Sequence, residues 1–221
     1  MANKSTGNCY ICGANLGKTA MINHLFKVHK EEGRQECCLL KIEGADDKNY
    51  WLYIDVPMEK TLSAVDVFLR KIWLECCGHL SEFYVINRVS RYHRPDRNQI
   101  EGNLKMETFD KGEKFFHDYD FGTTTETVIT VAGRTRRKPQ KDPVRVLARN
   151  VLPDYTCADC GKPAAYICQE CIYQTDNPFF CEKCIKGHEH EMRLPVTNSP
   201  RIGECGYGGE HDVYKFIPAE I

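Results

Sequence analysis

Residues 157–190 read CADCGKPAAYICQECIYQTDNPFFCEKCIKGHEH, and the spacing of cysteine and histidine in this stretch decides how the last third of the chain folds. Three Cys-x-x-Cys pairs precede two histidines, which gives eight candidate metal ligands: Cys157, Cys160, Cys168, Cys171, Cys181, Cys184, His188 and His190. Eight ligands are what two tetrahedral zinc ions need. The stretch is too short and too polar to fold on an apolar core alone, so the metal has to supply much of its stability.

Two pairings of these ligands are open. In the interleaved pairing, which resembles the B-box and related cross-brace modules, the first and third Cys-x-x-Cys pairs bind one ion, and the second pair binds the other ion together with the histidines. In the sequential pairing, the first two pairs share one ion. The loop between Cys160 and Cys168 is short, which favours interleaving. Cys205, in a glycine-rich tail, is an alternative eighth ligand to His190, and His211 is a weaker one.

Composition indicates metal binding rather than a disulfide framework for the thirteen cysteines. The chain has 30 Lys and Arg against 31 Asp and Glu, so no overall field holds it on nucleic acid or on an anionic membrane. No stretch is apolar enough for a membrane helix, and the start has no hydrophobic signal region. We therefore expect a cytoplasmic protein without a membrane partner, and in a reducing compartment paired cysteines and histidines usually hold metal.

Residues 9–29, CYICGANLGKTAMINHLFKVH, resemble a Cys2His2 zinc finger with the ligands Cys9, Cys12, His24 and His29. A Cys-x-x-Cys knuckle directs two thiolates at one point, and histidines about one helical turn apart project from the same face of a helix. The sequence thus predicts a third zinc ion, about three per chain in total. Of the positions that face bases in such a finger, only Asn23 is a usual base reader, so we expect a stabilising or protein-contact role.

The middle region, residues 36–133, is predicted to be an α+β domain with a small mixed sheet and one main helix. Apolar runs at 37–42 and 50–56 predict a hairpin, and apolar residues at helical spacing predict a helix that starts near Thr61 or Ser63 and ends at Gly78. Further strands are expected at 80–86, 113–119 and 125–133.

Several short motifs of this region carry a family resemblance. They are the Trp51 strand that ends in Val56 and Pro57, the Thr61-Leu62 helix start, the His79-Leu80-x-x-Phe83 segment and the Tyr119-Asp120-Phe121-Gly122 turn. Together they resemble the plasmid pRiA Orf-three-like family, whose members are also described as insertion-element TnpR passenger proteins. The resemblance implies an α+β fold and brings no established activity.

The remaining cysteine pairs, Cys37–Cys38 and Cys76–Cys77, could converge on a further metal site. Adjacent residues in a strand or helix point in different directions, however, so we expect these four cysteines to be structural. His79 is close to Cys77 in sequence, but nothing marks an organised pair of nucleophile and base. We therefore predict no catalytic residue and no enzyme.

A basic stretch, residues 134–152, is predicted to link the middle domain to the zinc module at 153–221. Its candidate phosphate-binding residues are Arg134, Arg136, Arg137, Lys138 and Lys141. With the finger at 1–33, this organisation predicts a non-enzymatic zinc-binding adaptor or interaction protein. The alternative is a nucleic-acid-binding accessory protein of a mobile element that uses the finger and the basic linker.

Overall fold

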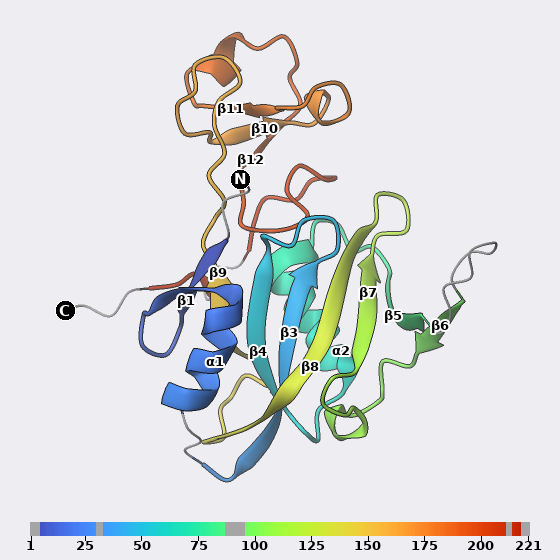
Figure 1. Ribbon diagram of the computed structural model, residues 1–221. Coiled ribbons are helices and arrows are strands. Elements are labelled where there is room, and N and C mark those ends of the chain that lie inside the picture. Colours follow the sequence, from blue (N-terminus) through green and yellow to red (C-terminus); the bar gives the residue numbers. More distant parts are fainter. Residues whose placement is uncertain (1–4, 30–32, 87–95, 211–213, 218–221) are drawn as a thin grey trace.

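A nine-stranded antiparallel sheet forms the body of the computed structural model, which describes residues 5–29, 33–86, 96–210 and 214–217 (Figure 1). The strand order is β2-β1-β9-β4-β3-β8-β7-β5-β6. The strands are β1 (Thr6–Cys9), β2 (Asn15–Gly17), β3 (Gln35–Gly44), β4 (Trp51–Pro57), β5 (Ser81–Ile86), β6 (Arg97–Ile100), β7 (Lys114–Tyr119), β8 (Thr125–Arg137) and β9 (Arg145–Asn150).

Two of the central strands, β4 and β8, are rich in β-branched and aromatic residues. The predicted hairpin is confirmed as β3 and β4, which pair from Cys37 with Pro57 to Glu43 with Trp51. All seven residues of β4 are buried, whereas β8 alternates between buried and partly buried residues over most of its length. The two patterns place β4 in the interior and leave one face of β8 closer to solvent.

The main helix covers one face of this sheet. Helix α2 (Leu62–Leu69) starts after Thr61 and continues into a π-helical turn, Arg70–Leu74, so the predicted helix is present but shorter. Its buried side chains, among them Val65, Phe68 and Trp73, pack on apolar residues of the central strands. In the part of the chain that the structure describes, no helix is long and apolar enough to span a membrane.

The predicted fold class, α+β with a small mixed sheet and one main helix, is wrong. The fold is mostly β: the large sheet is antiparallel throughout, and its only α-helices among the described residues are α1 (Lys18–Val28) and α2. The sheet gains strands from segments assigned elsewhere by the sequence pattern. The finger supplies β1 and β2, the predicted linker supplies the end of β8 and all of β9, and the polar stretch after β5 supplies β6.

Backbone pairing explains these additions, because ladder hydrogen bonds do not depend on an apolar side-chain pattern. Strand β1 pairs with β9 from Gly7 with Asn150 to Cys9 with Ala148, which places the finger at one end of the sheet. At Gly7 a Cβ atom would lie 2.3 Å from the carbonyl oxygen of Arg149 and 2.5 Å from the Trp51 ring. Only glycine allows this close approach.

The C-terminal module has its own three-stranded sheet, in the order β11-β10-β12, and lies beyond one end of the large sheet (Figure 1). Its strands are β10 (Tyr166–Cys168), β11 (Phe179–Phe180) and β12 (Arg193–Pro195), with 3-10 turns at Cys171–Tyr173 and Cys184–Gly187; a further 3-10 turn, Met106–Thr108, belongs to the body. The chain then returns along the large sheet, where the Asn198 side chain pairs with that of Asn150 and the Ser199 hydroxyl donates to the Trp73 carbonyl.

Candidate metal centres

Four groups of cysteine and histidine side chains, each with four ligand atoms within 4.8 Å of one another, lie in the described part of the chain. The groups are Cys9, Cys12, His24 and His29; Cys157, Cys160, Cys181 and Cys184; Cys168, Cys171, His188 and His190; and Cys76, Cys77, His79 and Cys205. The first three contain all twelve ligands predicted from the sequence, and the fourth was not predicted. Each group could hold a metal ion.

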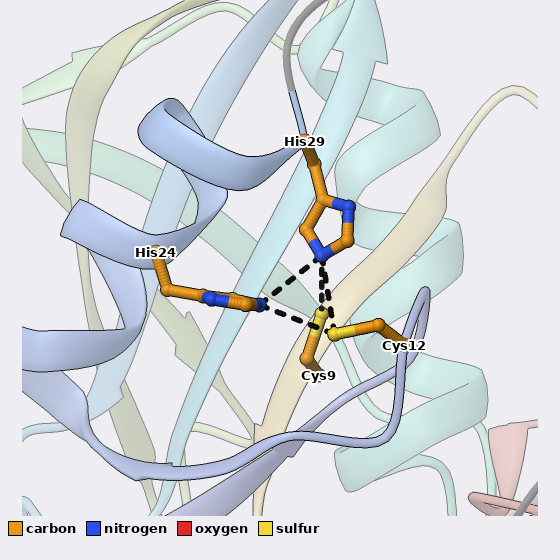
Figure 2. A group of neighbouring side chains, drawn as sticks. All are labelled: Cys9, Cys12, His24 and His29. Atoms are coloured by element: carbon orange, nitrogen blue, oxygen red, sulfur yellow. Dashed lines mark hydrogen bonds between the residues drawn. The ribbon is translucent and has the colours of Figure 1, made fainter.

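The finger ligands face one point from two elements (Figure 2). Cys9 lies at the end of β1 and Cys12 in the following turn, while His24 is on α1 and His29 directly follows it. The Sγ of Cys12 is 3.2 Å from Nε2 of His24, and the two Nε2 atoms are 3.1 Å apart. Zinc bonds of about 2.3 Å to sulfur and 2.0 Å to nitrogen would place neighbouring ligands of a tetrahedron about 3.3–3.8 Å apart, so the group is close to the size that zinc requires.

Apolar packing also fixes the finger on the large sheet. Met21 and Leu25, on the buried side of α1, share a cluster with Leu39, Trp51 and Tyr53 of the sheet. Cys9 is fully buried in the same cluster, and burial raises the pKa of its thiol. A thiolate at this position therefore needs a cation, and a zinc ion would supply one.

The C-terminal module has the interleaved arrangement. Cys160 Sγ lies 3.7 Å from Cys181 Sγ, which joins the first and third pairs. Cys171 Sγ lies 3.3 Å from Nε2 of His188, and Cys168 Sγ lies 3.4 Å from Nδ1 of His190. The sequential pairing is not formed. His190 keeps its place in the second group, Cys205 belongs to another group, and His211 lies outside the described residues.

Backbone amides point at the sulfur atoms of the module. The amides of Cys171 and Cys184 each donate to the first sulfur of their own pair, Cys168 and Cys181, at 3.5 Å. Burial alone would raise the pKa of Cys157, but nearby backbone amides, including those of Cys181 and Cys160, outweigh it and lower the pKa to about 6. At Cys157 the backbone thus stabilises the charged form that binds metal.

The fourth group shows where the sequence argument was incomplete. Cys37 and Cys38 are buried in β3, where burial raises the pKa of both thiols to about 11, and neither belongs to a metal group. Cys76 and Cys77 follow the π-helical turn, in an irregular segment where adjacent side chains can face the same point. The available signal was the close spacing of Cys76, Cys77 and His79, together with an unassigned cysteine in the tail.

Most arginines of the predicted linker have partners within the protein. Arg134 donates to the Phe109 carbonyl, Arg136 pairs with Glu36 at 2.8 Å, and buried Arg137 pairs with Asp55 at 2.9 Å. Lys138 and Lys141 are exposed in the connection between β8 and β9. The basic stretch is therefore largely part of the sheet. Three of its five candidate residues, Arg136, Lys138 and Lys141, are exposed, and Arg136 is paired with Glu36.

No family model matches the chain, and no curated protein matches it. One solved structure that it resembles is the crystal structure of a protein of unknown function from Methanosarcina mazei Go1, at 18% identity and a TM-score of 0.42, over 58% of this chain and 75% of that chain. Similarity at this level supports no inference about the present protein.

Proposed function

We propose that the protein is a non-enzymatic zinc-binding adaptor whose three predicted sites are structural. The observation that carries this proposal is that each of the three groups already supplies four protein ligands. Four ligands fill the tetrahedral shell of zinc, whereas catalytic zinc keeps a position for water or substrate. Thiolate and imidazole ligands are also the set that suits zinc best.

The chemistry of the sites gives the adaptor its rigid parts. Zinc in the finger would hold α1 against the edge formed by β1 and β2, and the paired ions of the module would hold its short strands together. Both parts would then present fixed surfaces to a partner. The partner in this proposal is another protein.

Cobalt substitution tests whether the sites are closed. Cobalt(II) takes the place of zinc in tetrahedral sites, and its visible spectrum changes when a small anion such as azide or thiocyanate enters an open position. We expect no spectral change on adding either anion to the cobalt-loaded protein. A saturable change would show an open coordination position and would contradict the structural assignment.

Nucleic-acid binding is the second candidate, and the exposure of Lys138 and Lys141 favours it. Both lysines lie in the connection that follows β8, and Lys138 lines the same cleft as His29 of the finger. The adaptor ranks first because Arg134, Arg136 and Arg137 have intramolecular partners. An electrophoretic shift of duplex DNA at about 50 mM salt, where phosphate contacts are strong, distinguishes the two.

The family resemblance of residues 36–133 and the cytoplasmic location stay predictions. If the resemblance holds, the finger and the zinc module are additions to an Orf-three-like core. The adaptor proposal does not depend on it, because it rests on the ligand groups alone.

A further inference from the structure

The fourth ligand group joins two segments that are far apart in sequence. Cys76, Cys77 and His79 follow the π-helical turn, and Cys205 lies in the C-terminal tail, 128 residues after Cys77. Cys77 Sγ is 3.8 Å from Cys76 Sγ and 3.6 Å from Cys205 Sγ, and all four ligand atoms lie within 4.8 Å of one another. His79 Nε2 is 2.9 Å from Cys77 Sγ and 3.5 Å from Cys205 Sγ.

These separations are those of ligands around one ion. With Zn–S bonds of about 2.3 Å and a Zn–N bond of about 2.0 Å, neighbouring ligand atoms of a tetrahedral site lie about 3.5–3.8 Å apart. Three of the four separations agree with this, and the distance from Cys77 Sγ to His79 Nε2, 2.9 Å, is shorter. A disulfide would need a sulfur separation of about 2.0 Å, and all three cysteines are free thiols. The geometry therefore matches a metal site and not a covalent bond.

The backbone is shaped to bring the four ligands together. The chain reverses at Gly78, which has a positive φ of 84°, so that Cys77 and His79 face the same point. Cys205 has a φ of 50°, in the left-handed region that costs a non-glycine residue free energy unless its surroundings hold it. The side chain of Gln169 supplies such a hold, because it donates to the carbonyl oxygens of Gly203 and Cys205.

The charges beside the group suit a site with three thiolates. Three thiolates and one Zn²⁺ carry a net charge of −1, and the fully buried guanidinium of Arg201 lies 3.5 Å from Cys76 Sγ. Arg201 also pairs with Asp120 at 2.7 Å, and the Asp120 carboxylate lies 3.4 Å from Nε2 of His79. A buried cation next to an anionic metal site lowers the cost of burying both.

We propose that Cys76, Cys77, His79 and Cys205 form a fourth zinc site, which fixes the tail to the main body of the protein. The tail already contacts the end of the π-helical segment, where the Ser199 hydroxyl donates to the Trp73 carbonyl at 2.6 Å and the Tyr207 hydroxyl to the Ile72 carbonyl at 3.2 Å. The metal would connect Cys77 with Cys205, which are 128 residues apart. A cross-link that closes so long a loop restricts the unfolded chain most. This site goes beyond the three sites of the proposed function.

Zinc counting in matched variants tests the proposal. We expect the full-length protein, saturated with Zn²⁺ and gel-filtered, to hold four ions by elemental analysis and native mass spectrometry. Cys205→Ser and Cys77→Ser, which change exposed ligands on different segments, should each hold three. Cys37→Ala changes a cysteine outside every metal group and should keep four.

The tail provides a second measurement. Arg201 is fully buried, so wild type and Cys37→Ala should resist trypsin at this residue, whereas Cys205→Ser and Cys77→Ser should be cut there. After zinc removal in denaturant, the wild-type chain should show thirteen free thiols. Eleven thiols would show a disulfide in place of the metal site and would overturn the proposal.

The readouts separate this proposal from the proposed function. A difference of one ion between wild type and both ligand variants supports the fourth site, whatever the total. Equal zinc in wild type and either ligand variant overturns it, as does the loss of more than one ion from both variants. A total below three ions in Cys37→Ala and wild type alike would count against the three-site adaptor instead.

Discussion

The large sheet and the C-terminal module differ in what fills their interiors. The main core of the sheet consists of aliphatic and aromatic side chains such as Leu40, Ile54 and Trp73, with a single fully buried cysteine, Cys38. The buried cluster of the module has six residues, of which four are cysteines and only Phe180 and Ile185 are apolar. Burying one large apolar side chain contributes about 1.5–3 kcal/mol, whereas structural zinc contributes about 10–16 kcal/mol in small domains.

The finger combines both kinds of interior. Its Cys9 lies in an apolar cluster with Met21 and Leu25, and these side chains pack directly on Trp51 of the sheet. Segments of similar cysteine and histidine spacing thus lie in different structural settings. One is part of the sheet and shares its core, whereas the other has little apolar core of its own. Under the proposed function, removing metal should therefore affect the two ends of the chain differently.

The largest expected effect is the response of the module to a chelator. In excess EDTA at neutral pH, residues 155–195 should lose their fold, because two ions hold a segment with little apolar core. The large sheet should stay folded, since its core contains no proposed ligand of the module. Limited proteolysis followed by mass spectrometry should map new cuts to the module.

Re-addition of zinc is the control and should restore resistance to the protease. Cuts within β3, β4 or β8 that appear as early as cuts in the module would show that the two regions depend on the same metal. The comparison between an apolar and a metal-filled interior would then be wrong.

A smaller effect is expected when the apolar core alone is weakened. Leu40→Ala removes a fully buried side chain of the sheet and should lower its free energy of unfolding by about 2–5 kcal/mol. The zinc content should not change. Val67→Ala, on the exposed side of α2, is the matched control and should change stability by less than about 1 kcal/mol.

Denaturant unfolding by circular dichroism measures the stability, and elemental analysis the zinc. If Leu40→Ala released zinc from folded protein, the core of the sheet and the metal sites would be coupled more tightly than their separate interiors imply.

A third prediction concerns acid and depends on a polar group at the margin of the sheet core. Burial alone would raise the pKa of Asp66, but hydrogen bonds from His117 and Ser81 outweigh it and lower the pKa to about 2. Because the folded pKa lies below the unfolded value of 3.8, this contribution is fully present above about pH 4 and is lost as the pH falls toward 2. Since Asp66 is partly exposed, we expect about 1–2 kcal/mol from it at pH 7.

Asp66→Asn should therefore lower the stability of the sheet at pH 7 and converge on wild type near pH 2. Acid also releases zinc, so the unfolding of both proteins is compared in EDTA. The measured unfolding signal then comes from the sheet alone. A stability difference that stays constant between pH 6 and pH 2 would show that Asp66 contributes through packing and not through its charge.

The grouping of the candidate ligands was easier to predict from the sequence than the fold, for a physical reason. Ligand spacing is a local property: Cys9 and Cys12, or Cys181 and Cys184, face one point because of the turn between them. The group of Cys76, Cys77, His79 and Cys205 was missed because its side chains meet through the tertiary path of the tail. The fold class was wrong because β1, β6 and β9 are strands through their pairing with neighbours, and none has a strong apolar alternation of its own.

The smallest expected effect concerns the exposed lysines beside the finger, which belong to neither interior. If the protein binds duplex DNA, Lys138→Ser with Lys141→Ser removes up to two phosphate contacts, so the slope of log affinity against log salt should flatten by up to about 1.8. Arg137→Ser should instead destabilise the sheet, because it leaves the buried Asp55 carboxylate with one partner fewer.

Fold stability and zinc content should not change in the double lysine variant. Its sequence preference should also stay the same, because phosphate contacts carry little of that preference. Fluorescence anisotropy from about 50 to 200 mM salt measures the slope, and an unchanged slope in the double variant would leave the connection between β8 and β9 as a structural link only.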